Sequence, residues 1–220
     1  MVRAPERQEY VSLAELLNLE GKVAIVTGGG MGIGHGIVTR LSEAGATMVI
    51  ADRNMEAAEA VVTEIRERGR QAMAVHCDVT KEEDIKRMVA EAVREYGHVD
   101  VLVNNAGIYP FTPAMQLKVE DWDRIQNINL RGTFLFNRAF TEQAAKQGSG
   151  GAIVNIGSID SIHPTMVGLA AYDASKGRVL MFTKNFALEA AQYGVRVNMI
   201  APGGIATEGT TKGLRPLHSS

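Results

Sequence analysis

Short apolar runs rich in β-branched residues recur along the chain, separated by longer stretches with helix-compatible patterning. The runs return about every 25 residues, which is typical of βαβ units. Their apolarity is continuous rather than alternating, which favours parallel strands buried on both faces. The predicted strands cover residues 23–28, 47–52, 72–78, 99–107, 152–158 and 195–203. The predicted helices cover residues 34–44, 55–68, 81–96, 119–146 and 172–192.

This rhythm predicts one doubly wound α/β domain over residues 19–220, preceded by an N-terminal extension over residues 1–18. The glycine-rich stretch 147–151 (QGSGG) is a turn inside the domain, because the strand rhythm continues after it. In the extension, residues 10–19 (YVSLAELLNL) predict a short amphipathic helix that packs on the domain or, alternatively, forms a subunit contact.

Composition narrows the possible partners and the compartment. The chain has 220 residues, 45% of them hydrophobic, and a net charge of −2 without a basic cluster, which favours a small-molecule partner over nucleic acid or a membrane surface. We expect no secretion signal, and no apolar run of membrane-spanning length occurs in the sequence. Cys77 is the single cysteine and the histidines lack paired ligand spacing, so we expect a cytoplasmic protein without a bound metal.

A glycine-rich turn follows the first predicted strand and opens the first helix. Its sequence is TGGGMGIG, from Thr27 to Gly34. Glycines let a backbone turn sharply and approach a pyrophosphate, and the N–H groups of a helix N-terminus attract its negative charge. The position between strand and helix predicts a Rossmann-type dinucleotide site formed by Gly28, Gly30, Met31, Gly32 and Ile33.

Asp52 ends the second strand eighteen residues after Gly34, close to the spacing of the acid that binds the adenosine ribose. Its carboxylate would repel a 2′-phosphate, so NAD is favoured over NADP. The neighbouring Arg53 could pair with such a phosphate, or simply be solvated. Asp78, with Val79, ends the third strand where it could meet the adenine edge, or it could cap the turn before Thr80.

Tyr172 and Lys176 are candidates for acid/base chemistry. With five tyrosines and eight lysines, a Tyr four positions before a Lys is expected by chance roughly 0.2 times, so the pair alone is modest evidence. The spacing nevertheless puts both side chains on one helical face. An ammonium close to a phenol would lower the pKa of the phenol from about 10 towards neutral pH.

Six separately placed motifs together resemble the short-chain dehydrogenase/reductase family. They are TGGGMGIG at Thr27, NNAG at Asn104, NINLRGTF at Asn127, NIGS at Asn155, YDASK at Tyr172 and PGGIAT at Pro202. Any one could occur by accident, whereas all six in this order are highly specific. The resemblance covers residues 19 to 207 and implies a three-layer fold with strand order 3-2-1-4-5-6.

The resemblance also implies hydride transfer between NAD(P) and a secondary alcohol or ketone of the sugar, polyol, steroid or ketoacyl type. Tyr172 would exchange the proton at oxygen, and Lys176 would bind the nicotinamide ribose. Ser158 would hydrogen-bond the substrate oxygen, although the spacing leaves Ser161 as an alternative. Asn129 would hold a water of a proton relay, or be a satisfied core amide.

Two more segments resemble cofactor-binding segments of the family. Residues Asn105, Ala106 and Gly107 would pass the adenosine ribose, and Pro202, Gly203, Ile205 and Thr207 would seat the nicotinamide carboxamide. Taken alone, the second segment could be a plain turn.

The residues after Thr207 are fewer than the resemblance implies, and they lack a strand pattern. A seventh strand and the substrate lid are therefore expected to be missing. This leaves a second hypothesis, a truncated or degenerate dinucleotide-binding module without a competent substrate pocket. We expect a homodimer or homotetramer formed through the long helices, with the dimer favoured.

Overall fold

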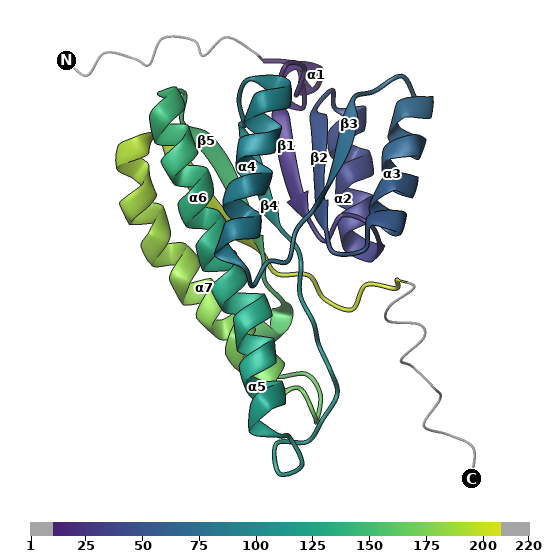
Figure 1. Ribbon diagram of the computed structural model, residues 1–220. Helices are drawn as coiled ribbons and strands as arrows, with labels where there is room; N and C mark the ends of the chain where they lie inside the picture. The colour runs from purple at the N-terminus through teal and green to yellow at the C-terminus, as the bar shows by residue number, and fades with distance from the viewer. Residues whose placement is uncertain (1–10, 208–220) are drawn as a thin grey trace, which may run out of the picture.

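The computed structural model describes residues 11–207 and contains one all-parallel sheet in this part of the chain. The strand order is β3-β2-β1-β4-β5-β6, which confirms the predicted topology (Figure 1). The strands are β1 (Val23–Thr27), β2 (Thr47–Asp52), β3 (Ala72–His76), β4 (Val101–Asn104), β5 (Gly151–Ile156) and β6 (Val195–Ile200). Residues 208–220 lie outside the described part, so the expectation of a missing seventh strand is not tested.

Helices connect the strands as βαβ units. They are α2 (Gly32–Glu43), α3 (Met55–Glu67), α4 (Glu82–Tyr96), α5 (Val119–Gln126), α6 (Gly132–Gln147) and α7 (Ala170–Ala190), with α1 (Leu13–Leu16) before the sheet. Short 3₁₀ turns at Ile159–Ser161 and Ala191–Tyr193 follow β5 and α7.

Alternate residues of the strands pack into two separate cores, one on each face of the sheet. The sheet and the helices on its two faces therefore form three layers. Ile25, Val49 and Val75 pack with apolar residues of α4 and α6, whereas Val26 and Ile50 pack with those of α2 and α3. Figure 1 shows these helix groups on opposite faces of the sheet. Because both faces of the central strands are covered, their apolarity is continuous, as the sequence indicated.

The outer strand β6 is covered on one face only. Val195 and Val197 are buried with the α4 and α6 side, whereas the alternate residues Arg196, Asn198 and Ile200 are exposed. Within residues 11–207, no element covers this half of the sheet on the α2 and α3 side (Figure 1). Buried and exposed residues therefore alternate along most of β6, whereas every residue of β1 is buried.

The N-terminal helix is shorter than predicted. Only Leu13–Leu16 is helical, starting at a capping box in which Ser12 and Glu15 bond each other's backbone. Leu13, Leu16 and Leu17 are exposed, and Leu19 packs against the core. The apolar face thus contacts little of the domain, and Tyr10 lies outside the described residues.

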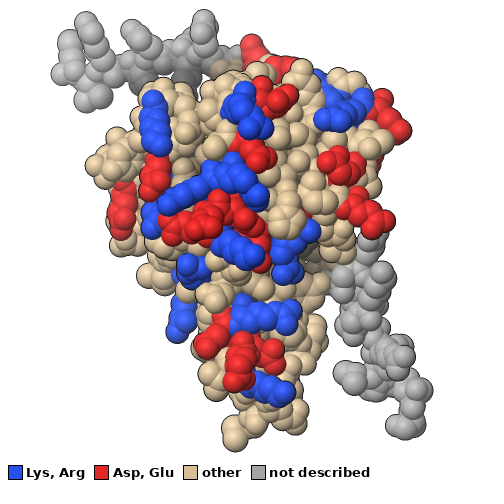
Figure 2. Space-filling model, in the orientation of Figure 1, with Lys and Arg blue, Asp and Glu red and all other residues tan. Residues whose placement is uncertain are grey.

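Charged side chains of both signs intermingle on the face that carries α4 and α6, as Figure 2 shows. Glu82 of α4 binds both Lys86 and, on α6, Arg138, each at 2.7 Å. Within residues 11–207, no helix is long and apolar enough to cross a membrane.

Candidate functional site

The glycine-rich turn is held tightly between β1 and α2. Gly28 has a φ of +63°, and a Cβ on Gly34 would lie only 2.0 Å from the carbonyl oxygen of Gly28. Only glycine fits this approach at Gly34. Met31 precedes α2 without a side-chain cap, so the first N–H groups of this helix, at Gly32 and Ile33, suit an anionic ligand such as a pyrophosphate.

Asp52 lies beside this turn, as its position in the sequence predicted. Its Oδ2 accepts a hydrogen bond from the Gly30 N–H at 3.0 Å, and its Oδ1 accepts one from the Asn54 N–H at 2.9 Å. The carboxylate thus lies at the carboxyl edge of the sheet next to the glycine turn. Arg53, beside it, is exposed.

Asp78 caps the turn after β3, which was one of the two roles considered for it. Its Oδ1 accepts hydrogen bonds from the Thr80 N–H and hydroxyl at 2.9 and 2.7 Å. Burial would raise the pKa of Asp78, but these bonds and the charges of Arg53 and Lys81 outweigh it and lower the pKa.

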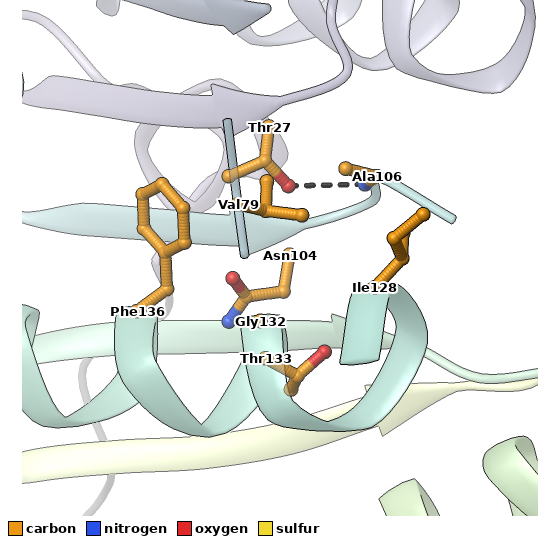
Figure 3. Close-up of a pocket in the computed structure, with 8 residues that line it drawn as sticks. All are labelled: Thr27, Val79, Asn104, Ala106, Ile128, Gly132, Thr133 and Phe136. Carbon is orange, nitrogen blue, oxygen red and sulfur yellow. Dashed lines mark hydrogen bonds between the residues drawn. The ribbon is translucent and has the colours of Figure 1, made fainter. Parts of the chain in front are cut away.

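The segment after β4 is bonded to the glycine turn. Thr27 accepts hydrogen bonds from the N–H groups of Asn105 and Ala106, each at 3.0 Å, and the Asn105 side chain donates to the carbonyls of Thr27 and Gly28. Figure 3 shows the Thr27 bond to Ala106 above Asn104. The small space lined by Thr27, Val79, Asn104 and Ala106 has no room for a water molecule, so their side chains pack closely at this point.

Lys176 of α7 is buried beneath the end of β5. Its Nζ donates to the Ile156 carbonyl at 2.7 Å and lies 5.7 Å from the centre of the Tyr172 ring. Burial lowers the pKa of Lys176 to about 8. A Cβ on Gly107 would lie 3.7 Å from this Nζ, so the backbone at Gly107 passes close to the ammonium.

Tyr172 lies one helical turn before Lys176, as predicted. Burial raises its pKa, and the charges of Asp160 and Asp173 raise it further, against the effect of a hydrogen bond with Ser158. The expectation that Lys176 lowers this pKa is therefore not met by the groups of the protein. The ammonium donates to the Ile156 carbonyl instead of the phenol, and the charges that act on the pKa of the phenol are those of two carboxylates.

The structure distinguishes between the two candidate serines. The Ser158 hydroxyl donates to Asp160 Oδ2 at 2.8 Å, and Ser158 lowers the pKa of Tyr172. The Ser161 hydroxyl instead accepts the Ser158 N–H at 3.1 Å and so caps the short turn. Of the two, only Ser158 acts on the pKa of the tyrosine.

Asn129 lies in a π-helical turn, Asn127–Arg131, that interrupts the helix predicted over residues 119–146. Its side chain bonds the N–H and the carbonyl of Ile108, each at 2.9 Å, and donates to Ser175 Oγ at 3.0 Å. Ser175 in turn donates to the Tyr172 carbonyl. The buried amide is thus fully satisfied, and it ties the loop after β4 to the tyrosine helix.

The segment after β6 returns to the same edge of the sheet. The Pro202 carbonyl accepts the Ile159 N–H at 2.9 Å, which joins it to the loop carrying Ser158. A Cβ on Gly32 would lie 3.6 Å from Thr207, so this segment reaches the glycine turn. Gly203 and Ile205 are exposed between these two contacts.

Several residues at the site were not singled out from the sequence. Tyr109 packs edge-on against Tyr172 with ring centroids 6.2 Å apart, and Asp160 accepts from Ser158 and Thr165. The carboxylate two residues after Ser158 was the available signal for Asp160. Tyr109 had none, because its contact depends on how the loop after β4 folds.

The fold, the glycine turn and the Tyr172 and Lys176 pair together define a Rossmann-type α/β protein with a candidate acid/base site. The family model described as short chain dehydrogenase matches residues 22–215, and the chain belongs to this family. Family membership makes the protein an oxidoreductase and implies a nicotinamide dinucleotide cofactor.

Related proteins cover most of the chain. A cyclopentanol dehydrogenase of Comamonas sp. (strain NCIMB 9872) is 44% identical over 186 residues, which are 84% of this chain and 74% of the relative. The hydroxynaphthalene reductase-like protein Arp2 of Metarhizium brunneum is 38% identical, over 87% of this chain and 71% of its own. A short-chain type dehydrogenase/reductase from Mycobacterium marinum superposes with a TM-score of 0.86 at 34% identity, over 88% of this chain and 78% of that structure.

Proposed function

We propose that the protein is an NAD-dependent dehydrogenase/reductase that interconverts a secondary alcohol and its ketone. The observation that carries this proposal is the convergence of Tyr172, Ser158 and Lys176 at the carboxyl edge of the sheet, beside the glycine turn. The names of its relatives, an alcohol dehydrogenase and a reductase-like protein, support the same reaction class.

The residues present fit a dinucleotide. The turn has no side chains at Gly28 and Gly34, where a Cβ would meet neighbouring atoms at 3.0 Å or less, and α2 begins without a side-chain cap. Gly28, Gly30, Met31, Gly32 and Ile33 would hold the pyrophosphate, and Asp52 the adenosine ribose. The adenine would lie against Asp78 and Val79, and the backbone of Asn105, Ala106 and Gly107 would pass the ribose.

Each catalytic side chain has one task in this proposal. Tyr172 gives its proton to the carbonyl oxygen during reduction and takes it back during oxidation. Ser158 binds that oxygen, and Lys176 holds the nicotinamide ribose, while Asn129 fixes the loop at Ile108. Pro202, Gly203, Ile205 and Thr207 would seat the carboxamide. The nicotinamide accepts or supplies the hydride when bound.

The test is turnover of secondary alcohols with NAD or NADP, monitored as reduced cofactor, in the wild type and in Tyr172→Phe. Cyclopentanol is the natural first substrate, because a relative is named for it. We expect turnover in the wild type and at least a hundredfold loss in the variant, which keeps the ring but lacks the proton. Binding of NADH without turnover of any alcohol or ketone tried would favour a binding module instead.

Asp52 carries the proposed preference for NAD. Its carboxylate lies beside the turn, where it would repel a 2′-phosphate, whereas Arg53 is exposed. We expect Asp52→Ala to weaken NAD more than NADP, because only NADP gains from losing the negative charge. The ratio of their dissociation constants checks this, and an unchanged ratio would show that another residue selects the cofactor.

A further inference from the structure

Ser175 lies in α7, three residues after Tyr172 and one before Lys176, and its side chain is completely buried. Its Oγ donates a hydrogen bond to the Tyr172 carbonyl at 2.6 Å and accepts one from Asn129 Nδ2 at 3.0 Å. The first bond stays within the helix, whereas the second crosses to the π-helical turn at Asn127–Arg131. Ser175 therefore joins the helix that carries Tyr172 to a second element of the site.

The direction of each hydrogen bond in this network is fixed. The Ile108 N–H can only donate, so it bonds Asn129 Oδ1, and the Ile108 carbonyl can only accept, so it bonds Asn129 Nδ2, each at 2.9 Å. The second proton of that nitrogen then points to Ser175 Oγ, which accepts it. The one proton of the Ser175 hydroxyl is left for the Tyr172 carbonyl. Removal of this hydroxyl therefore leaves a buried N–H of Asn129 without its partner.

The loop bonded to Asn129 contacts both proposed catalytic residues of α7. A Cβ on Gly107 would lie 3.7 Å from Lys176 Nζ. Two residues later, Tyr109 packs edge-on against the Tyr172 ring, with the ring centroids 6.2 Å apart. The contacts form a closed circuit, which begins at the carbonyl of Tyr172 and returns, through the serine, the amide and the loop, to its phenol ring.

A second buried serine, Ser42 in α2, makes only the bond within its own helix. Its hydroxyl donates to the Thr39 carbonyl at 2.8 Å, with the same spacing of three residues. Both serines thus bond a carbonyl of the preceding turn, as serines in helices commonly do. The bond from Asn129 to Ser175 is the difference between them, and it is the one that links two elements of the site.

We propose that Ser175 is a positioning residue of the reaction, which acts through Asn129 to keep Tyr109 packed against the ring of Tyr172. This rests on the proposed function, in which Tyr172 exchanges the proton. One end of the circuit holds the backbone of Tyr172 and the other end holds its ring, so the phenol has a fixed position before a substrate binds. Loss of the Ser175 hydroxyl releases the loop and, with it, the ring.

Hydrogen exchange of the Ile108 amide, measured by nuclear magnetic resonance, tests the link from Ser175 to the loop without any turnover. In Ser175→Ala, Asn129 loses one partner, so this amide should exchange roughly tenfold faster than in the wild type. The Ala106 amide, which bonds Thr27 instead, should keep its rate. The same Ile108 rate in Ser175→Ala and in the wild type overturns the proposal.

The matched control for this experiment is Ser42→Ala, which removes the same group from a buried serine elsewhere. It should leave the exchange of the Ile108 amide at the wild-type rate. Faster exchange in both alanine variants would show a general loosening of the fold and would overturn the proposal.

Turnover per NADH-binding site tests the effect on the reaction. In Ser175→Ala, kcat should fall roughly tenfold, because the phenol is no longer held in place. The dissociation constant of NADH should stay near the wild-type value, because the glycine turn and Asp52 are untouched. Ser175→Cys, whose thiol is a weaker donor and acceptor, should lie between the wild type and Ser175→Ala. Wild-type kcat in Ser175→Ala, or an equal loss in Ser42→Ala, overturns the positioning role.

A double-mutant cycle with Tyr109→Ala tests whether Ser175 acts through the loop. Tyr109→Ala already removes the ring that the loop presents, so adding Ser175→Ala should lower kcat little further. Two losses that multiply in the double variant would overturn the proposal. Absence of turnover in the wild type counts against the proposed function alone, because the exchange of the Ile108 amide still decides whether Ser175 holds the loop.

Discussion

At the scale of single residues, burial of the Lys176 ammonium is unfavourable for the charged form of this side chain. Lys176 is buried with one hydrogen bond from its Nζ, to the Ile156 carbonyl, and burial lowers its pKa from 10.5 to about 8. The folded protein therefore binds fewer protons at Lys176 than the unfolded chain does between these two values. Stability from this group consequently rises as the pH rises from about 8 to 10.5.

Lys176→Met tests this linkage. Methionine has no proton to lose, so the wild type should gain stability relative to the variant as the pH rises through this window, by at most about 1.4 kcal/mol per pH unit. Free energies of unfolding from urea titrations between pH 7 and 10 provide the measurement.

The buried thiol of Cys77 changes the stability with pH in the opposite direction, both in the wild type and in Lys176→Met. Burial raises its pKa to about 12, so it destabilises the fold as the pH rises above 9. Its contribution cancels in the difference between wild type and Lys176→Met. If the difference in unfolding free energy between the two proteins stays constant across this pH range, burial does not lower the pKa of Lys176.

At the scale of elements, the sequence pattern predicted the strands and the family resemblance predicted their order, but neither predicted the details that build the site. Both β1 and β2 begin at the predicted residue, and β2 also ends at the predicted residue. A strand buried on both faces is a continuous apolar run in the sequence, and turn residues on either side mark its ends. The glycine turn was equally predictable, since the close approach at Gly34 admits no other residue. These features depend on local sequence alone.

The π-helical turn at Asn127–Arg131 could not be predicted in the same way. It interrupts a stretch whose periodicity is helical throughout, and Asn129 within it bonds the Ile108 backbone, which is distant in the sequence. Such turns recur at functional sites because they re-aim a side chain without ending the helix. The bond that the Ser158 hydroxyl donates to Asp160 was missed for a related reason, since it depends on a turn that only the folded loop adopts.

At the scale of the whole molecule, apolar side chains on α6 and α7 remain exposed to solvent. They include Phe134 of α6 together with Met181 and Leu188 of α7, and a groove lined by Thr141, Phe186 and Tyr193 lies between the two helices. Exposed apolar patches of this kind mark contacts with other subunits. We therefore expect a homodimer that buries these helices against a second copy of the chain.

Sedimentation velocity checks this assembly. The wild type should sediment as a dimer, whereas Leu188→Glu should shift it towards monomer, because burying an unpaired carboxylate in the interface is costly. Leu13→Glu on α1 is the comparison variant, since Leu13 is as exposed as Leu188, at 73% against 77%, and its segment is the alternative subunit contact. A compact tetramer would contradict the predicted stoichiometry, and equal dissociation by both variants would show that the contact does not lie on α7.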